Sequence, residues 1–299
     1  MPHSMTKNSN AKLVYDAKAT LGEGPVWDPF KQLLFWVDIE GKKLHQYNPI
    51  NGENRQWSFE GMLGAAVPAE NGNLILALEP GLASFNTETG TLLQHNALEN
   101  HDTDMRYNDG KVGPNGNFWI GSMHKKFVPK SGNLYRVDAQ YTVTTHVSQT
   151  TISNGMAWSA DNKTFYYIDS DDRKVYGFDF DISTSSISNK RILLSIPEQY
   201  GSPDGMSIDA EGMLWIAHWG GNCVRRWNPD TGEVLETVEV DAPHVTSCCF
   251  GGKNLDHLYI TSARSDLSEK QLQTFPKSGG LFVYRPKVKG TPITLFKNK

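Results

Sequence analysis

Four short segments combine glycine with acidic or amide residues, and each lies about ten residues before an apolar run. Carboxylate and amide oxygens are the ligands that Ca²⁺, Mg²⁺ and Mn²⁺ prefer in proteins. A cation also offsets the cost of burying several carboxylates together. A fold that gathers these segments therefore predicts a divalent-metal site. The segments are Gly22-Glu23-Gly24-Pro25, Tyr107-Asn108-Asp109-Gly110, Ser153-Asn154-Gly155 and Pro203-Asp204-Gly205.

Asn-Gly and Asp-Gly are also the usual dipeptides of β-hairpin turns, and each segment taken singly fits that role. Hairpin turns fall between paired strands, whereas these segments precede the first apolar run of a unit. Four of them at the same phase favour a shared site. On this basis Glu23, Asn108 or Asp109, Asn154 and Asp204 are expected on one ring.

The elements that position this ring are six apolar runs that begin 40 to 49 residues apart. A polar turn and a second strand follow each run, a repeat typical of β-propellers with four-stranded blades. We therefore predict an all-β, six-bladed β-propeller, whose innermost strands line a central tunnel. The runs are Leu34-Phe35-Trp36-Val37, Leu74-Ile75-Leu76-Ala77, Phe118-Trp119-Ile120-Gly121, Phe165-Tyr166-Tyr167-Ile168, Leu214-Trp215-Ile216-Ala217 and Leu258-Tyr259-Ile260-Thr261.

The ends of the chain should complete the ring. A seven-bladed repeat propeller is disfavoured because a single Trp-Asp pair occurs, at Trp27-Asp28. Closure predicts that Leu13-Val14-Tyr15 pairs with the last unit, near Gly280-Leu281-Phe282-Val283-Tyr284. We expect residues 1–12 to be a disordered leader and residues 13–299 to form one domain. Helices should be few.

Composition excludes several classes of protein. The net charge is −4 and basic residues are interspersed, so no nucleic-acid partner is expected. The longest apolar runs are too short to span a membrane. The three cysteines, Cys223 and the pair Cys248-Cys249, form no disulfide or zinc pattern. We expect buried thiols in a reduced, cytoplasmic protein that is a monomer or a weak homo-oligomer.

At the glycine-rich segments the chain resembles the SMP-30/gluconolactonase/regucalcin-like family. The similarity runs from about Leu13 to the C-terminus and keeps the order of the family's motifs. The matching stretches are Leu21-Gly22-Glu23-Gly24-Pro25-Val26-Trp27, Arg106-Tyr107-Asn108-Asp109-Gly110-Lys111, Ile152-Ser153-Asn154-Gly155, Phe165-Tyr166-Tyr167-Ile168-Asp169-Ser170, Pro203-Asp204-Gly205-Met206, Ile208-Asp209-Ala210-Glu211-Gly212 and Thr246-Ser247-Cys248-Cys249-Phe250-Gly251-Gly252.

The resemblance implies a propeller that hydrolyses sugar lactones, the aldonolactones, at one divalent metal ion (Ca²⁺, Mg²⁺, Mn²⁺ or Zn²⁺). It implies Glu23, Asn154 and Asp204 as metal ligands. It also implies that Arg106 and Asn108 contact the lactone. Asp204 is our candidate general base, because a metal-bound carboxylate can still accept a proton from a neighbouring water. Arg106 would bind substrate oxygens, with a substrate oxygen or Asp109 as its partner.

One stretch departs from the pattern of the animal relatives. The loop Met123-His124-Lys125-Lys126 is basic where they carry acidic residues, which leaves the identity of the sugar open. His124 is a candidate substrate contact, while the roles of Lys126 and His218 stay open. Two alternatives to lactone hydrolysis remain: a non-catalytic calcium-binding regulator, and a luciferin-regenerating or esterase-like hydrolase that uses the same metal site.

Overall fold

The computed structural model describes residues 8–98 and 102–298. Short β-strands dominate this part of the chain. Within it, the helical segments are α1 (Glu269–Thr274) and the 3₁₀ turn η1 (Glu198–Tyr200). The predictions of an all-β protein and of few helices are confirmed.

Four sheets have four antiparallel strands each, in the order of the chain. The first contains β3 (Gly22–Asp28), β4 (Leu33–Asp38), β5 (Lys43–Tyr47) and β6 (Asn54–Ser58). The second contains β7 (Leu63–Pro68), β8 (Leu74–Leu78), β9 (Gly81–Phe85) and β10 (Leu92–Gln94). The third contains β11 (Met105–Val112), β12 (Phe118–His124), β13 (Gly132–Val137) and β14 (Val143–Thr150). The fourth contains β15 (Ser153–Trp158), β16 (Thr164–Asp169), β17 (Lys174–Asp181) and β18 (Ser186–Ser195).

The remaining strands form one larger sheet that divides naturally into two parts. One residue pair, Trp219 with His244, joins the parts. The first part contains β19 (Ser202–Ile208), β20 (Leu214–Trp219), β21 (Cys223–Trp227), β22 (Val234–Glu239) and β1 (Asn8–Asn10). The second contains β23 (His244–Gly251), β24 (His257–Ala263), β25 (Leu281–Tyr284) and β2 (Lys12–Tyr15).

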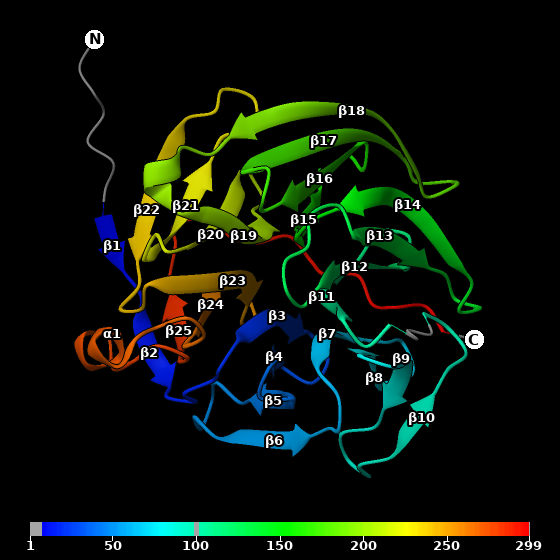
Figure 1. The fold of residues 1–299 in the computed structure, drawn as a ribbon, viewed down its shortest axis with the longest axis horizontal. Helices are drawn as coiled ribbons and strands as arrows, with labels where there is room; N and C mark the ends of the chain where they lie inside the picture. Colours follow the sequence, from blue (N-terminus) through cyan, green and yellow to red (C-terminus); the bar gives the residue numbers. More distant parts are fainter. Residues whose placement is uncertain (1–7, 99–101, 299) are drawn as a thin grey trace.

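The first strands of these groups lie next to one another around the centre of the molecule (Figure 1). β3 contacts β7, β7 contacts β11, β11 contacts β15, β15 contacts β19, β19 contacts β23, and β23 contacts β3. This arrangement of sheets is consistent with a β-propeller. It places the start of each first strand, where the glycine-rich segments lie, near one end of a common axis.

Each predicted apolar run occupies the second strand of its group, in β4, β8, β12, β16, β20 and β24. These strands are buried on both faces because neighbouring sheets pack against them, so they are continuously apolar instead of alternating. Leu34, Phe35, Trp36 and Val37 illustrate this, since their side chains are fully inaccessible to solvent. The repeat in the sequence therefore predicted the position of these strands.

The two ends of the chain pair with strands far away in sequence. β2 pairs antiparallel with β25, with Leu13 opposite Phe282, as predicted. The prediction of a disordered leader over residues 1–12 is wrong for its second part, because β1 pairs in parallel with the outer edge of β22. An outer strand offers unpaired backbone groups, and β1 satisfies some of them. Residues 1–7 lie outside the described residues.

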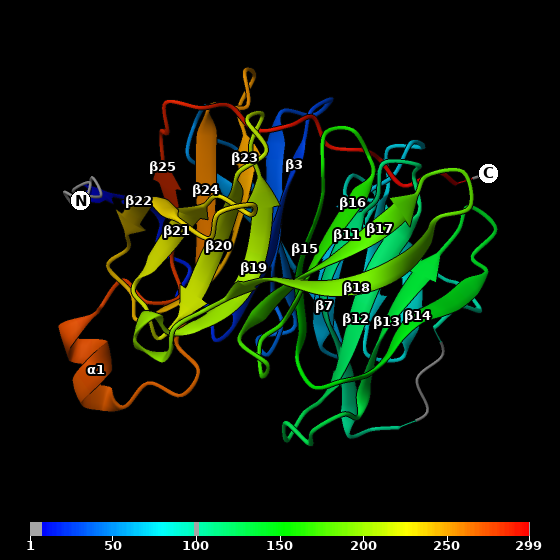
Figure 2. The ribbon, with the colours of Figure 1, turned by 90° about the horizontal axis from the view of Figure 1, so that it is seen from above.

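The C-terminal segment, residues 289–297, crosses one face of the molecule (Figure 2, red). Ala210 N donates to Lys289 O at 2.8 Å, and at the other end Phe296 N donates to Pro68 O at 2.9 Å. Phe296 is fully buried in the apolar core between the second and third sheets. The segment thereby ties together parts of the molecule that the repeat alone does not connect.

Candidate metal and substrate site

The four glycine-rich segments lie inside strands β3, β11, β15 and β19, and none of them forms a hairpin turn. Each strand has a break in its pairing register at the segment. The breaks fall between Glu23 and Val26, Tyr107 and Gly110, Ser153 and Met156, and Pro203 and Met206. Such β-bulges re-aim side chains and are frequent beside functional sites. The preference for a shared site over four hairpin turns is therefore supported by the backbone.

The glycines of two segments allow neighbouring first strands to approach closely. A Cβ on Gly155 would lie 2.6 Å from the carbonyl oxygen of Asp204 and 2.6 Å from Cβ of Met206. A Cβ on Gly205 would collide with the side chain of Ser247. The glycines thus serve packing near the axis, and the residues beside them are brought together as a consequence.

The predicted residues line one cavity of about 300 Å³. Glu23, Arg106, Asn108, Asn154 and Asp204 all contribute to its wall, and each is only 4–7% exposed. They lie in four strands, β3, β11, β15 and β19, each from a different sheet or part of a sheet. Residues from different strands are more than 40 positions apart in the sequence. Their convergence is therefore a property of the fold. The cavity is large enough for a monosaccharide-sized ligand.

Side-chain hydrogen bonds link these residues across strands. Arg106 Nη1 donates to Asn108 Oδ1 at 2.5 Å and to Tyr107 O at 3.0 Å. Asn108 Nδ2 donates to Ser153 O at 2.8 Å and to Asn154 Oδ1 at 3.2 Å. These bonds hold the two predicted substrate contacts in a defined orientation relative to Asn154.

Ser170 extends this network. Asn154 Nδ2 donates to Ser170 Oγ at 2.9 Å, and Ser170 Oγ donates to Pro203 O at 2.6 Å. The amide orientation of Asn154 is thereby set, and its strand is connected to the residue before Asp204. Sequence reasoning missed this role, although Ser170 directly follows the strand that ends at Asp169.

The carboxyl groups of Glu23 and Asp204 are both buried and lie close to each other. Among the described residues, neither forms an ion pair with a basic side chain. Burial raises the pKa of Glu23 well above its usual range, and the charges of Asp204 and Asp109 raise it further. Burial likewise raises the pKa of Asp204, followed by the charge of Asp109, while contacts with Asn154 and Glu23 act in the opposite direction. A bound cation would stabilise the ionised form of these two buried carboxyl groups.

The donor atoms of Glu23, Asn154 and Asp204 fit a hard divalent ion: two carboxylates and one amide oxygen. Within residues 8–98 and 102–298, there is no cluster of three or more His, Cys, Asp or Glu side chains that could hold a metal ion. The candidate site has only two carboxylates, and its third ligand is the amide oxygen of Asn154.

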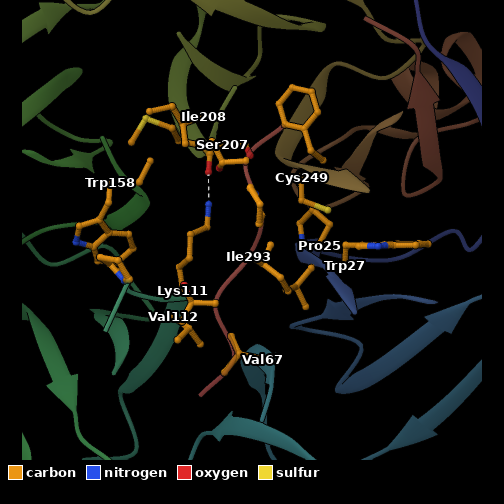
Figure 3. A pocket seen from close by; sticks show the side chains of 18 of the residues that line it. Pro25, Trp27, Val67, Lys111, Val112, Trp158, Ser207, Ile208, Cys249 and Ile293 are labelled. Atoms are coloured by element: carbon orange, nitrogen blue, oxygen red, sulfur yellow. Dashed lines mark hydrogen bonds between the residues drawn. The ribbon is translucent and has the colours of Figure 1, made fainter. Parts of the chain in front are cut away.

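A second cavity, of about 420 Å³, lies at the opposite end of the same strands. The start of each strand lines the first cavity, and the later residues, such as Trp27, Trp158 and Ile208, line the second. Ile293 of the C-terminal segment also contributes to its wall (Figure 3). Lys111 reaches across it, and its Nζ donates to Met206 O at 2.6 Å. None of the three predicted metal ligands, Glu23, Asn154 and Asp204, lines this second cavity.

Asp109 belongs to the second cavity, although Asn108 beside it lines the first. Its Oδ1 accepts from Gly110 N at 3.0 Å, and no hydrogen bond to Arg106 is present in the described part of the chain. The expectation that Asp109 is a resting partner of Arg106 is therefore wrong. Successive side chains at the bulge point in different directions, and this separates the two residues.

The histidines and lysines singled out in the sequence do not line the first cavity. His124 ends β12 with its Nδ1 accepting from Lys126 N at 3.0 Å, while Met123 and Phe127 reach the cavity instead. Lys126 is largely exposed, 3.9 Å from Asp104. His218 is fully buried, and burial lowers its pKa well below the usual value. The structure therefore does not support His124 as a substrate contact.

Several residues of the cavity wall were not predicted as part of the site, and Trp219 and Glu40 are two of them. Trp219 lines the cavity and stacks on His244 with ring centroids 4.0 Å apart. Glu40 lies in the turn after β4, outside every recognised motif. The sequence carries no signal for Glu40, because only the turn's position above the cavity brings it there.

Comparison with known proteins identifies the family of the chain. A model of the SMP-30/gluconolactonase/LRE-like region matches residues 21–264. The chain belongs to this family. Among relatives, the regucalcin of Danio rerio is 38% identical over 282 residues, which cover 93% of this chain and 95% of the relative.

Solved structures of two relatives cover nearly the whole of this SMP-30/gluconolactonase/LRE-like chain. A calcium-binding protein, regucalcin, from Agrobacterium tumefaciens has a TM-score of 0.93 at 28% identity, covering 98% of this chain and 99% of that one. A luciferin-regenerating enzyme has a TM-score of 0.89 at 35% identity, covering 96% and 99%. Within the described residues, no helix is long and apolar enough to cross a membrane.

Proposed function

We propose that this protein hydrolyses sugar lactones to aldonic acids with the aid of one divalent metal ion. The observation that carries the proposal is the single cavity lined by Glu23, Asn154 and Asp204 together with Arg106 and Asn108. The three proposed metal ligands therefore lie next to Arg106 and Asn108, whose side chains can bind a neutral, oxygen-rich ligand. The family name and the luciferin-regenerating relative support a hydrolase.

Glu23, Asn154 and Asp204 would hold the metal, and their oxygen donors favour Ca²⁺, Mg²⁺ or Mn²⁺ over Zn²⁺. When bound, such an ion polarises a carbonyl and lowers the pKa of water in its coordination sphere. The likeness to a calcium-binding regucalcin supports a metal of this class.

The chain's own residues account for the rest of the reaction. Arg106 binds the lactone carbonyl oxygen, on which negative charge develops as water adds to the carbonyl carbon. Asn108, held by Arg106 and Asn154, orients the ring. A carboxylate oxygen of Asp204 accepts the proton of the attacking water and returns a proton to the ring oxygen as its bond to the carbonyl carbon breaks. The products are the open-chain acid and no other molecule.

We also propose that the molecule is a closed six-bladed propeller, in which each strand group is one blade and β1 adds a fifth strand to the blade of β19–β22. The contacts that lead from β3 through β7, β11, β15, β19 and β23 back to β3 support this count. The pairing of β2 with β25 supplies the closing strand. Such closure protects strand edges and holds the four bulged strands at constant distances around the site.

Hydrolysis of a panel of aldonolactones, measured with added Ca²⁺, Mg²⁺ or Mn²⁺ and with EDTA, tests the proposal. We expect turnover that EDTA removes and the ion restores. Asp204→Ala should abolish turnover, while Asp230→Ala, which removes an exposed aspartate in a turn, should not. Metal-independent turnover that survives Asp204→Ala would contradict the proposed mechanism.

The relatives' names favour two other functions. A non-catalytic calcium-binding regulator would bind the ion and hydrolyse no lactone, and the buried Arg106–Asn108 pair would then have no substrate to contact. A luciferin-regenerating or esterase-like hydrolase would prefer other substrates at the same residues. Including simple aryl esters in the panel separates this possibility from sugar lactone hydrolysis.

A further inference from the structure

Glu40 is an acidic residue in the wall of the candidate cavity that none of the motifs includes. It follows β4 and is held in place from the far end of the chain. Ser265 Oγ donates to Glu40 Oε2 at 2.8 Å, and Ser265 N donates to Thr20 O at 2.9 Å. The carboxylate is therefore tethered at the cavity although the side chain is exposed.

Glu40 and Arg106 line the same cavity without forming an ion pair. Among the described residues, no carboxylate lies within the 4.0 Å ion-pair distance of the Arg106 guanidinium. Burial lowers the pKa of Arg106, and among the acidic groups that oppose this effect Glu40 acts most strongly, ahead of Glu23 and Asp204. The two charges thus face a common space that neither fills.

The two side chains offer complementary hydrogen-bonding groups. A guanidinium only donates, whereas an ionised carboxylate only accepts. A lactone ring oxygen and carbonyl oxygen only accept, so an unsubstituted lactone can use Arg106 but has nothing to donate to Glu40. A polyhydroxylated lactone can satisfy both groups at once.

We propose that Glu40 accepts a hydrogen bond from a hydroxyl group of the substrate and thereby selects polyhydroxylated lactones over unsubstituted ones. This inference rests on the proposed lactonase function and deepens it by naming the feature of the substrate that is recognised. An analogue without the hydroxyl group loses a hydrogen bond to a charged carboxylate. Because Glu40 is exposed, water can take the place of the lost partner, so the discrimination is smaller than at a fully buried polar site.

The kinetic test compares D-glucono-δ-lactone with δ-valerolactone, which has the same ring and no hydroxyl groups. Glu40→Ala should lower kcat/KM for gluconolactone roughly 3- to 10-fold, mainly through KM, and change that for valerolactone less than about twofold. Glu40→Gln keeps one acceptor and should lose less. Glu88→Ala removes an exposed glutamate in the turn after β9 as a matched control.

An equal loss with both lactones would overturn the inference, because Glu40 would then act through Arg106 or through the fold. No loss with either would also overturn it. Calorimetric binding of two non-hydrolysable six-membered ring ethers, 1,5-anhydro-D-glucitol with its hydroxyl groups and tetrahydropyran without them, provides a readout that does not need turnover. Wild-type preference for anhydroglucitol that Glu40→Ala removes would support the role of Glu40, even if absence of lactone hydrolysis contradicted the proposed function. Equal binding of the two ethers by wild type would overturn it.

Discussion

Arg106 donates a hydrogen bond to Asn108, two residues further along the same bulged strand, with Nη1 and Oδ1 2.5 Å apart. Asn108 in turn donates to Asn154 Oδ1 from the next strand group. The predicted substrate contacts and one predicted metal ligand therefore form a continuous polar network. A change at either end of the network should affect the position of the other residues.

Arg106→Ala should leave divalent-metal affinity nearly unchanged and lower kcat/KM for lactones by roughly two to three orders of magnitude. In the proposed mechanism, Arg106 contacts the oxygen on which charge develops and is not a metal ligand. Steady-state kinetics, metal titration and melting temperature should be measured on the same variant. Arg191→Ala, which removes an exposed arginine paired with Asp179, is the control. An unstable but fully active Arg106→Ala protein would remove Arg106 from the site.

Glu23→Gln should abolish the thermal stabilisation that Ca²⁺, Mg²⁺ or Mn²⁺ gives to the wild type. An ion that binds only the folded protein stabilises it by about 2.7 kcal/mol at 100 times its Kd. Without metal, the variant should be at least as stable as wild type, because it lacks a buried charge beside Asp204. Differential scanning fluorimetry with and without each ion measures both effects. A metal-induced shift retained in Glu23→Gln, as in the control Glu88→Gln, would exclude Glu23 as a ligand.

Gly155→Ala should destabilise the protein by roughly 1–3 kcal/mol, because its Cβ would be forced against Asp204 O and Met206 in the neighbouring strand. Gly72→Ala is an informative comparison, since that position has open space and a φ of 81°. It should cost about 1 kcal/mol through backbone conformation alone. Chemical denaturation gives both values. If lactone turnover by Gly155→Ala were normal at temperatures where it is folded, the close approach of the two strands would not matter for the site.

The free energy of unfolding should fall as the pH is lowered from about 6.5 towards 4, in part because of His45. Burial lowers the pKa of His45 to about 4; Asp38 opposes this shift and Lys43 adds to it. The ring stacks on Trp36, and its Nδ1 is 3.0 Å from Asn54 Nδ2. The unfolded chain therefore binds a proton over this pH range that the folded chain excludes, which destabilises the folded state.

His45→Gln should reduce this pH dependence by up to about 3 kcal/mol between pH 7 and pH 4. Urea denaturation at several pH values measures it for wild type and variant. The same substitution at the partly exposed His124 is the control. An unchanged slope in His45→Gln would show that other groups cause the loss of stability.

Much of the fold was predictable because it repeats. Six apolar runs at similar spacing each became the second strand of a group, since strands covered on both faces must be apolar throughout. The four glycine-rich segments were also recognised from their common phase. That Glu23, Asn154 and Asp204 share a cavity with Arg106 and Asn108 agrees with the spacing, because equivalent positions in a repeat lie at equivalent heights along its axis.

By itself, the sequence determined the all-β fold class, the repeat and the residue types of the candidate site, since these depend on local patterns that recur. Only the tertiary structure decided which neighbours face the cavity. The bulge in β11 sends Asn108 to one cavity and Asp109 to the other, and a shift of one residue there has no signature in the sequence. Glu40 reaches the site, and β1 pairs with β22, through contacts between residues more than 60 apart. Such contacts depend on how the whole chain packs, and no local pattern encodes them.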